Sequence, residues 1–227
     1  MPSSIVETFT LPSSAGILAD FLLHQDIQAH FVGGVIRDSL LKIETDDIDV
    51  AVEGNALIIG KAAASNLKGT YIELDRDRGI CRVVVAGEKG FQADFVSANE
   101  GIKADLTRRD FTINSMAMDI ESVRTCEGKV SFTISNLIDP LNGRSDLNSG
   151  KLRAVSSSSL SDDPVRLMRA VRLSSQYGMR LEDKTYNQIK NIAPQLKGIA
   201  PERIRDEFLK TLSLRGASDS IRLMDKL

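Results

Sequence analysis

Residues 30–50 read HFVGGVIRDSLLKIETDDIDV, and this stretch decides the fold. A short apolar run precedes Gly33-Gly34, an amphipathic segment follows over 35–41, and the stretch ends in an alternating run from Asp47 to Val50. The pattern predicts a strand, a glycine turn, a helix and a second strand. Paired glycines at such a turn let backbone N–H groups approach a phosphate, and the start of a helix favours negative charge. Gly33 and Gly34 are therefore candidate phosphate-binding residues, the alternative being an ordinary tight turn.

The second strand of this stretch carries two carboxylates. Residues two apart on a strand point to the same face, so Asp47 and Asp49 are expected side by side, while Ile48 and Val50 form an apolar opposite face. Neighbouring carboxylates repel each other and favour a nearby cation. Mg²⁺ prefers such oxygen ligands, completed by water and substrate phosphates. Asp47 and Asp49 are candidate Mg²⁺ ligands, the alternative being solvated surface charge, and the combination suggests nucleotidyl chemistry.

A third carboxylate, Asp94, lies in the alternating run FQADFV of residues 91–96. A neighbouring strand could bring it to the first two, where it would help to place a second metal or to activate a hydroxyl. The alternative is an ordinary aspartate on an edge strand.

Composition limits the class of protein. The 227 residues suffice for one large or two small domains with a real core, and a net charge of −2 means that RNA contact would need local basic patches. Two cysteines do not indicate a disulfide scaffold. The N-terminal residues do not resemble a signal peptide, and no apolar run approaches the roughly 20 residues of a membrane span. We expect a cytoplasmic protein without membrane association.

The order of predicted elements favours an α+β fold in two parts. Residues 1–155 mix helices and strands, including a helix capped by Asn55 and a hairpin over 80–97, and predict a small mixed sheet backed by helices. Residues 1–14 are interpreted as a loosely held lead-in, and residues 122–137 as a second hairpin or an irregular pair of strands. After residue 156 only helical patterns occur, at 163–176, 183–193, 202–213 and 217–226. The predicted domains are therefore 1–155 and an all-helical part, 156–227.

Two polar segments are candidate nucleotide readers. In the block RRDFTIN, residues 108–114, an arginine could clamp phosphates or a ribose, and Asp110 and Asn114 could read a 2′-hydroxyl. The alternative is a cluster of salt bridges at a helix start.

The second segment is DDPVR, residues 162–166. On one helix, position 162 or 163 would share a face with Arg166, giving a paired hydrogen-bonding edge that could match the edge of a base. A helix start with favourable acids is the alternative. Arg166, Arg169 and Arg172 recur every third residue, as a basic ridge or a solvated face.

Taken in order, several segments resemble the tRNA nucleotidyltransferase/poly(A) polymerase family, bacterial class II, within the polymerase-β-like nucleotidyltransferases. The matching segments lie between about residue 30 and residue 210. In order, they read GGVIRD, DDIDV, ADLTRRDFTINSMAMD, IDPLNGRSDL, DDPVRLMRAVR and PERIRDEF. One departure is Asp162, where the family commonly has Glu. The family continues into helical body and tail domains beyond a neck, so residues 156–227 are expected to be the neck and a truncated start of the body.

The resemblance implies a role for each segment. It implies a nucleotidyltransferase head that uses Mg²⁺ and CTP or ATP on the 3′ end of tRNA or another RNA. By residue, it implies that Gly33, Gly34 and Arg37 hold the triphosphate and that Asp47 and Asp49 bind two Mg²⁺. Arg109, Asp110 and Asn114 would lie by the ribose, and Asp163 and Arg166 would read the base. Asp139 and Gly143 would belong to a hinge, and Arg203 and Glu207 would support the residues that read the base. Beside these, Asp94 stays a catalytic candidate and Arg169 a nucleotide-binding candidate by the patterns of their own segments.

The implied reaction is attack of an RNA 3′-hydroxyl on the α-phosphate of CTP or ATP, with release of pyrophosphate. These motifs are shared by CCA-, CC- and A-adding enzymes, which therefore stay open as products. A poly(A) polymerase is the nearest alternative, and a nucleotide- or RNA-binding fragment without efficient turnover is the other.

Overall fold

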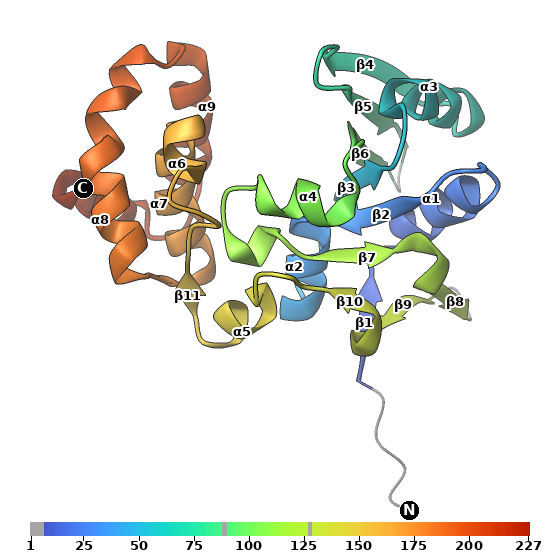
Figure 1. The fold of residues 1–227 in the computed structure, drawn as a ribbon, viewed down its shortest axis with the longest axis horizontal. Helices are drawn as coiled ribbons and strands as arrows, with labels where there is room; N and C mark the ends of the chain where they lie inside the picture. Colours follow the sequence, from blue (N-terminus) through green and yellow to red (C-terminus); the bar gives the residue numbers. More distant parts are fainter. Residues whose placement is uncertain (1–6, 88–89, 127–128) are drawn as a thin grey trace, which may run out of the picture. The chain divides into compact units, whose positions relative to one another are not determined.

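The computed structural model describes residues 7–87, 90–126 and 129–227. The chain divides into two compact units (Figure 1). The sheet unit comprises Met1–Leu106 and Met116–Pro140, and the helical unit comprises Thr107–Ser115 and Leu141–Leu227.

A mixed sheet forms the centre of the sheet unit. Its strands lie in the order β10 (Leu137–Ile138), β7 (Ala117–Asp119), β2 (Ala29–Val32), β3 (Asp47–Val52), β6 (Phe91–Ser97), β5 (Ile80–Val85) and β4 (Thr70–Asp75). β3 and β6 run parallel, and the other neighbours run antiparallel. The predicted mixed sheet and the predicted hairpin over 80–97 are therefore confirmed.

Helices cover the sheet as the apolar alternation requires. Ile48, Val50 and Val52 are fully or almost fully buried on one face of β3, so the aspartates of this strand lie on the other face. The helices of this unit are α1 (Ser13–Leu23), α2 (Gly34–Leu41), α3 (Ala56–Asn66) and α4 (Ile102–Thr107), whose last residue belongs to the helical unit. The Asn55 side chain accepts hydrogen bonds from the backbone N–H groups of Leu57 and Ile58, which confirms the predicted helix cap.

A second, smaller sheet corrects the prediction of a loose lead-in over residues 1–14. β1 (Thr8–Leu11) pairs antiparallel with β9 (Lys129–Thr133), and β9 pairs with β8 (Arg124–Cys126), which confirms the hairpin predicted over 122–137. Phe9 stacks on Phe132 with ring centroids 5.6 Å apart, and Leu11 is buried. These apolar contacts hold residues 8–11 in place, whereas residues 1–6 lie outside the described residues.

The helical unit contains short and long helices. They are α5 (Gly143–Asn148), α6 (Ser159–Asp162), α7 (Arg166–Tyr177), α8 (Asp183–Ile192), η4 (Ala193–Gly198), α9 (Pro201–Leu212) and α10 (Ala217–Lys226), with the turn η1 (Thr112–Asn114). A two-residue strand, β12 (Arg180–Leu181), pairs parallel with β11 (Lys151–Leu152). Two residues are too few to give a periodic pattern, so this strand was missed among the helical signals. In the part of the chain that the structure describes, no helix is long and apolar enough to cross a membrane.

The units do not follow the predicted division at residue 156. Residues 107–115 and 141–155 belong to the helical unit. Phe111 and Ala154 form an isolated antiparallel bridge, and the Thr112 N–H donates to the carbonyl of Arg153 at 3.0 Å. These backbone pairs join the 108–114 block to the segment after α5. Contacts between residues so far apart in the sequence cannot be predicted from a local pattern.

Candidate functional site

The glycine turn lies between β2 and α2. Gly33 has φ +69° and ψ −123°, a conformation that side chains rarely allow, and its N–H donates to the carbonyl of Met116 at 3.1 Å. A Cβ on Gly34 would lie 3.5 Å from Nη2 of Arg37. The guanidinium of Arg37 therefore lies next to the turn, as the motif predicts. It is buried and donates two hydrogen bonds of 2.9 Å to Asp38, the last residue of the GGVIRD motif.

The two aspartates of β3 share the sheet face opposite its apolar side. Asp47 is exposed and Asp49 is half-buried. The Gln92 side chain donates to Oδ1 of Asp47 at 3.0 Å, which holds that carboxylate at the start of the strand. The alternation read from the sequence therefore places both carboxylates on one face, as expected.

Asp94 joins the same face from the neighbouring strand. It lies in register with Asp49 across β3 and β6, and with Arg82 across β6 and β5. Nε and Nη2 of Arg82 donate to the two carboxylate oxygens of Asp94 at 2.6 and 2.7 Å. The hydrogen bond to Asp94 raises the pKa of the Arg82 guanidinium, which burial lowers, and the charges of Asp94, Asp47 and Asp49 add to the rise. One arginine therefore balances part of the charge of three aspartates.

This face can hold a divalent ion through two carboxylates. Within residues 7–87, 90–126 and 129–227, no group of three or more His, Cys, Asp or Glu side chains is arranged to hold a metal. Asp94 is paired with Arg82, which leaves Asp47 and Asp49 as the candidate ligands. Two aspartates suit Mg²⁺, because this ion keeps several waters and substrate oxygens in its shell. The donor set therefore fits the predicted metal.

The 108–114 block of the helical unit is organised around Asp110. This residue is 4% exposed, and its Oδ1 accepts from the Phe111 N–H at 2.8 Å and from the Asn114 side chain at 3.0 Å. Its Oδ2 accepts from Nη1 of Arg169 at 3.1 Å. Burial opposes ionisation of Asp110, but the Arg169 charge and these hydrogen bonds hold its pKa below the ordinary value. The buried Asp110 carboxylate therefore holds the Phe111 N–H, the Asn114 amide and the Arg169 guanidinium in fixed positions.

Arg169 links this block to α9. Its Nε donates to Glu207 at 3.3 Å, and Nε of Arg172 donates to the other oxygen of Glu207 at 2.7 Å. Burial alone would raise the pKa of Glu207, but the bond and charge of Arg172, with the charge of Arg169, lower it. The arginines spaced every third residue on α7 are thus neither a basic ridge nor a solvated face, because two of them bind buried carboxylates.

Asp163 and Arg166 do not share one helix, which corrects the prediction for residues 162–166. α6 ends at Asp162, Asp163 is extended with φ −149°, and α7 begins at Arg166. Pro164 explains the break, since the residue before a proline avoids the helical region.

Each of the two side chains has its own partners. The guanidinium of Arg166 donates to the carbonyls of Arg108, Arg109 and Ser159 at 3.1, 3.2 and 3.0 Å. Nη2 of Arg203 donates to Oδ2 of Asp163 at 2.7 Å. Among the described residues, Oδ1 of Asp163 is a buried oxygen without a hydrogen-bond partner. Arg166 thereby fixes the main chain of Arg109, whose side chain is half-buried.

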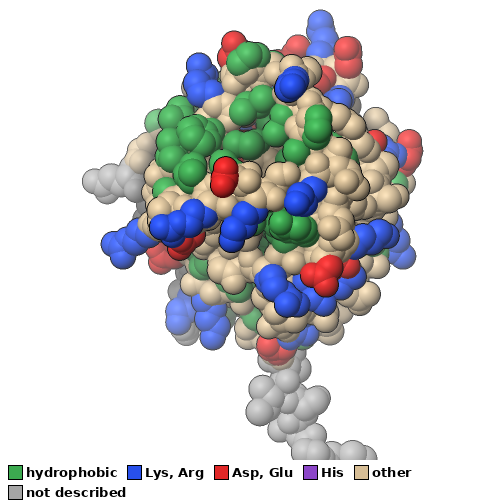
Figure 2. All heavy atoms as spheres, turned by 90° about the vertical axis from the view of Figure 1, so that its left-hand side faces the viewer, with side chains coloured by type: hydrophobic (Ala, Val, Ile, Leu, Met, Phe, Trp, Pro, Cys, Tyr) green, Lys and Arg blue, Asp and Glu red, His purple; other side chains and the backbone are tan. Residues whose placement is uncertain are grey.

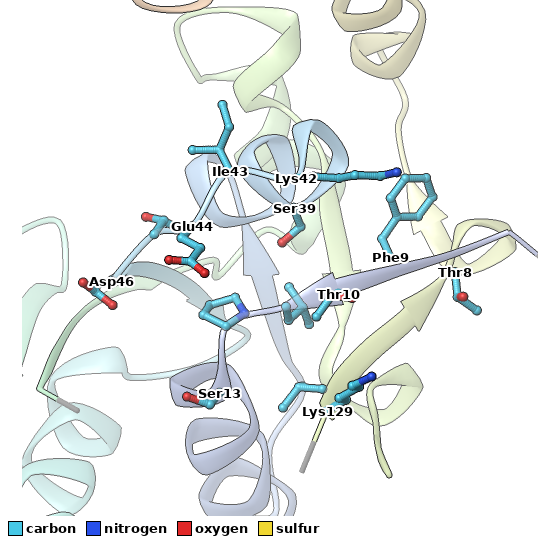
Figure 3. Close-up of a pocket in the computed structure, with 14 residues that line it drawn as sticks. Thr8, Phe9, Thr10, Ser13, Ser39, Lys42, Ile43, Glu44, Asp46 and Lys129 are labelled. Carbon is cyan, nitrogen blue, oxygen red and sulfur yellow. The ribbon is translucent and has the colours of Figure 1, made fainter. Parts of the chain in front are cut away.

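A cavity of about 660 Å³ lies beside the aspartate strand, where β1 and the segment ahead of β3 meet (Figure 3). Figure 3 shows the carboxylates of Glu44 and Asp46 on one side and the amines of Lys42 and Lys129 on the other. The cavity lining contains none of the predicted site residues, so the candidate phosphate and metal ligands lie outside it.

Sequence reasoning missed several polar partners. Arg82 was detectable in principle, because it alternates with apolar residues on a hairpin strand opposite Asp94. Asp38 was noted beside Arg37 in the GGVIRD motif, but the pairing of the two side chains was not predicted. Asp146, 5% exposed, accepts from Thr112 and Arg153, contacts that span 34 and 7 residues and that no local pattern could indicate.

Comparison with known proteins gives matches over most of the chain. A family model described as the Poly A polymerase head domain matches residues 29–153, and one described as the probable RNA and SrmB-binding site of polymerase A matches residues 178–227. The CC-adding tRNA nucleotidyltransferase of Geobacter sulfurreducens is 38% identical over 205 residues, which cover 90% of this chain and 44% of that protein. The A-adding tRNA nucleotidyltransferase of Halalkalibacterium halodurans is 32% identical over 196 residues, 78% of this chain and 43% of that protein.

A solved structure, the Thermotoga maritima CCA-adding enzyme complexed with tRNA, superimposes with a TM-score of 0.76 at 31% identity. The match covers 97% of this chain and 54% of that one. The chain therefore spans about half the length of the relatives it matches.

Proposed function

Because this chain belongs to the Poly A polymerase head-domain family, we propose that it is a template-independent nucleotidyltransferase that adds CMP or AMP to tRNA 3′ ends. The relatives that carry the names of CC-adding and A-adding enzymes support this reaction class. The proposal includes a cytoplasmic location, where tRNA and nucleoside triphosphates meet, and cell fractionation would test it.

The observation that carries the proposal is the shared face of Asp47 and Asp49, one strand away from the Gly33 turn. Gly33 follows Val32, which lies in register with Asp49. A triphosphate at the turn would therefore bring its reacting phosphate toward the carboxylates, with backbone N–H groups and Arg37 as its partners.

Mg²⁺ is the metal proposed for Asp47 and Asp49. When bound, it would lower the pKa of the RNA 3′-hydroxyl and neutralise charge on the triphosphate and on the leaving pyrophosphate. Asp47 and Asp49 would hold the metal, and Gln92 keeps the Asp47 carboxylate in place. We assign Asp94 a supporting part, because Arg82 occupies both of its oxygens.

The helical unit supplies the proposed readers of sugar and base. Arg109 and Asn114 are the candidate ribose contacts, and buried Asp110 holds Asn114 in position. For the base, Oδ1 of Asp163 would accept a hydrogen bond from the exocyclic amino group that cytosine and adenine each carry, since this buried oxygen has no protein partner among the described residues. Arg166 and Arg169 would act on the base and sugar mainly through the backbone of 108–109 and through Asp110.

RNA is the proposed second substrate. Figure 2 looks onto the side of the helices and shows Lys and Arg side chains spread over that face, among acidic and hydrophobic groups. Although the net charge of the chain is −2, these cationic side chains could each contact a phosphate of an RNA backbone. The match of residues 178–227 to an RNA-binding family model supports this assignment.

One incubation separates the possible products. Purified chain is mixed with Mg²⁺, labelled CTP or ATP, and tRNAs that lack CCA, end in CC or are complete. Addition that stops at CC, at one A or at CCA identifies the subtype, and long A-tails identify a poly(A) polymerase. If ATP or CTP binds without any incorporation, the chain is a binding module and the proposed reaction is refuted.

Substitution tests the metal ligands. Asp47→Asn and Asp49→Asn should each reduce incorporation by at least about a hundredfold, because each removes a charged ligand. Asp20→Asn, an exposed aspartate on α1, is the matched control and should retain activity. Circular dichroism should show the same helix content in all three variants, and substantial activity in either β3 variant would exclude the metal assignment.

A further inference from the structure

Asp146 is a buried carboxylate on α5, outside the proposed nucleotide contacts. It is 5% exposed, and its Oδ2 accepts from the Thr112 hydroxyl at 2.8 Å and from Nε of Arg153 at 2.9 Å. Its Oδ1 accepts from Nη2 of Arg153 at 3.2 Å. A buried charge needs such partners, so this carboxylate is fixed in one orientation.

Thr112 is held from two directions. Its side chain binds Asp146, and its backbone N–H donates to the carbonyl of Arg153 at 3.0 Å. The residue is 2% exposed and begins the turn η1, which ends at Asn114. Asp146 and Arg153 also form an ion pair with each other. The hydroxyl and the backbone N–H of Thr112 are therefore both hydrogen-bonded to members of this pair.

The turn that Thr112 begins carries the proposed ribose contact. Asn114 lies two residues further on, and its amide donates to Asp110 on the other side of Thr112. The carbonyl of Asp110 accepts from the N–H of Val155, so the same segment, 153–155, holds the backbone before and at the turn. A change at the Thr112 hydroxyl would therefore shift Asn114 relative to Asp110 without removing either side chain.

We propose that Asp146 and Thr112 are positioning residues for sugar selection, and that their hydrogen bond sets the turn from which Asn114 reads the ribose 2′-hydroxyl. The inference rests on the proposed function, because it takes Asn114 as a ribose contact. Neither residue touches the nucleotide, and both act through the backbone of η1.

The test compares nucleotides that differ only at the 2′ position. Dissociation constants for ATP and 2′-deoxy-ATP, and for CTP and 2′-deoxy-CTP, are measured with Mg²⁺ by calorimetry on the full 227-residue chain. Thr112→Val keeps the shape but removes the hydroxyl, and should reduce the preference for the ribonucleotide roughly fivefold, the worth of one ordinary hydrogen bond. Thr112→Ser restores a hydroxyl and should keep the preference of the unsubstituted chain.

Thr211→Val is the matched control. Thr211 is a fully buried threonine of α9 whose hydroxyl donates to the carbonyl of Glu207 within its own helix. Its loss should lower stability without changing the preference for the ribonucleotide. If Thr112→Val does not fold, Asp146→Asn decides the question, because it weakens the acceptor of the Thr112 hydroxyl and should also lower the preference.

Two results would overturn the inference. One is an unchanged preference in the folded Thr112 or Asp146 variant, and the other is an equal loss of affinity for both sugars, which would mean a purely structural role. Failure of the proposed function is distinct, because the unsubstituted chain would then bind none of these nucleotides or would bind them without incorporating them into tRNA.

Discussion

Arg82 and Asp94 face each other in register across β5 and β6, joined by hydrogen bonds of 2.6 and 2.7 Å. Asp94 is also the register partner of Asp49. The guanidinium therefore offsets part of the repulsion among the aspartates of this face before any cation binds. Arg82 and a divalent ion would compete for the same negative charge.

Removal of the Arg82 charge should strengthen cation binding. Arg82→Met replaces the aliphatic part of the side chain without the charge, and it should raise the affinity for Mn²⁺, a spectroscopic substitute for Mg²⁺, by roughly tenfold, because one unit of opposing charge is lost near the site. Electron paramagnetic resonance titration measures the free Mn²⁺. Arg78→Met, at an exposed arginine between β4 and β5, is the control and should leave the affinity unchanged. Weaker Mn²⁺ binding in Arg82→Met would show that Arg82 helps to build the site.

The sequence predicted this face only in part. The alternation around Asp47 and Asp49 was enough to place both carboxylates opposite an apolar face, because strand periodicity is a local property. Asp94 was left open between a third carboxylate and an edge-strand residue. The structure brings it to Asp49 but pairs it with Arg82, since cross-strand pairing depends on register and is not encoded within a single strand.

The ion pairs of Arg169 with Asp110 and Glu207 should stabilise the helical unit at neutral pH. Arg169→Met leaves Asp110 without its arginine and Glu207 with Arg172 alone. An unpaired buried charge costs about 3 kcal/mol, so the free energy of unfolding at pH 7 should fall by about that amount. Urea titration measures it. Arg205→Met, which breaks an exposed pair with Asp206, should cost less than about 0.5 kcal/mol.

The same network predicts how stability depends on pH. Burial opposes the ionisation of Asp110 and Glu207, but their arginine partners lower both pKa values below the ordinary 3.8 and 4.5. The stabilisation is therefore fully present above these ordinary values and is lost as the pH falls through the lower folded pKa values. Unfolding in urea between pH 6 and pH 3 should show this loss in the unsubstituted chain and a smaller loss in Arg169→Met. Equal pH profiles would contradict the assignment.

The DDPVR segment has a geometry that the sequence did not predict. Helical spacing suggested that position 162 or 163 would pair with Arg166, but Asp163 is extended before Pro164 and binds Arg203 instead. Arg203 is 40 residues away in the sequence, so its contact depends on how α9 packs. The motif selected Asp163 and Arg166 as candidates from local spacing, whereas the partners of the two side chains depend on packing.

His30 should make the sheet unit less stable in mild acid. It is a 5% exposed residue of β2, and among the described residues its Nδ1 has no hydrogen-bond partner. Burial lowers its pKa below 6.5, although the charges of Asp119, Glu53 and Asp105 oppose the shift. The unfolded chain takes up a proton more readily, so this contribution to stability is present above pH 6.5 and falls as the pH drops through the folded pKa.

Substitution isolates this effect. His30→Leu removes the proton acceptor and a buried polar atom, so it should raise the free energy of unfolding at pH 5 by more than at pH 8. Gln28→Leu is the control, because Gln28 is an exposed residue ahead of β2 without a titratable side chain, so its substitution should change the free energy of unfolding equally at pH 5 and at pH 8. A profile for His30→Leu parallel to that of the unsubstituted chain would mean that His30 does not titrate differently in the folded state.

Substitution of Gly33 should weaken nucleotide binding in addition to lowering the stability of the fold. Its φ of +69° with ψ of −123° excludes a side chain without strain of about 1–3 kcal/mol, and Gly33→Ala would shift the N–H groups at the start of α2. The affinity for ATP with Mg²⁺ should fall at least about tenfold, since the turn supplies the proposed phosphate contacts. Gly178→Ala is the control for backbone strain, because Gly178 ends α7 with φ +63° but belongs to the helical unit, whereas the glycine turn belongs to the sheet unit. Both variants should unfold at lower temperature, but only Gly33→Ala should lose affinity. An equal loss of affinity in both would mean that the turn does not contact the phosphates.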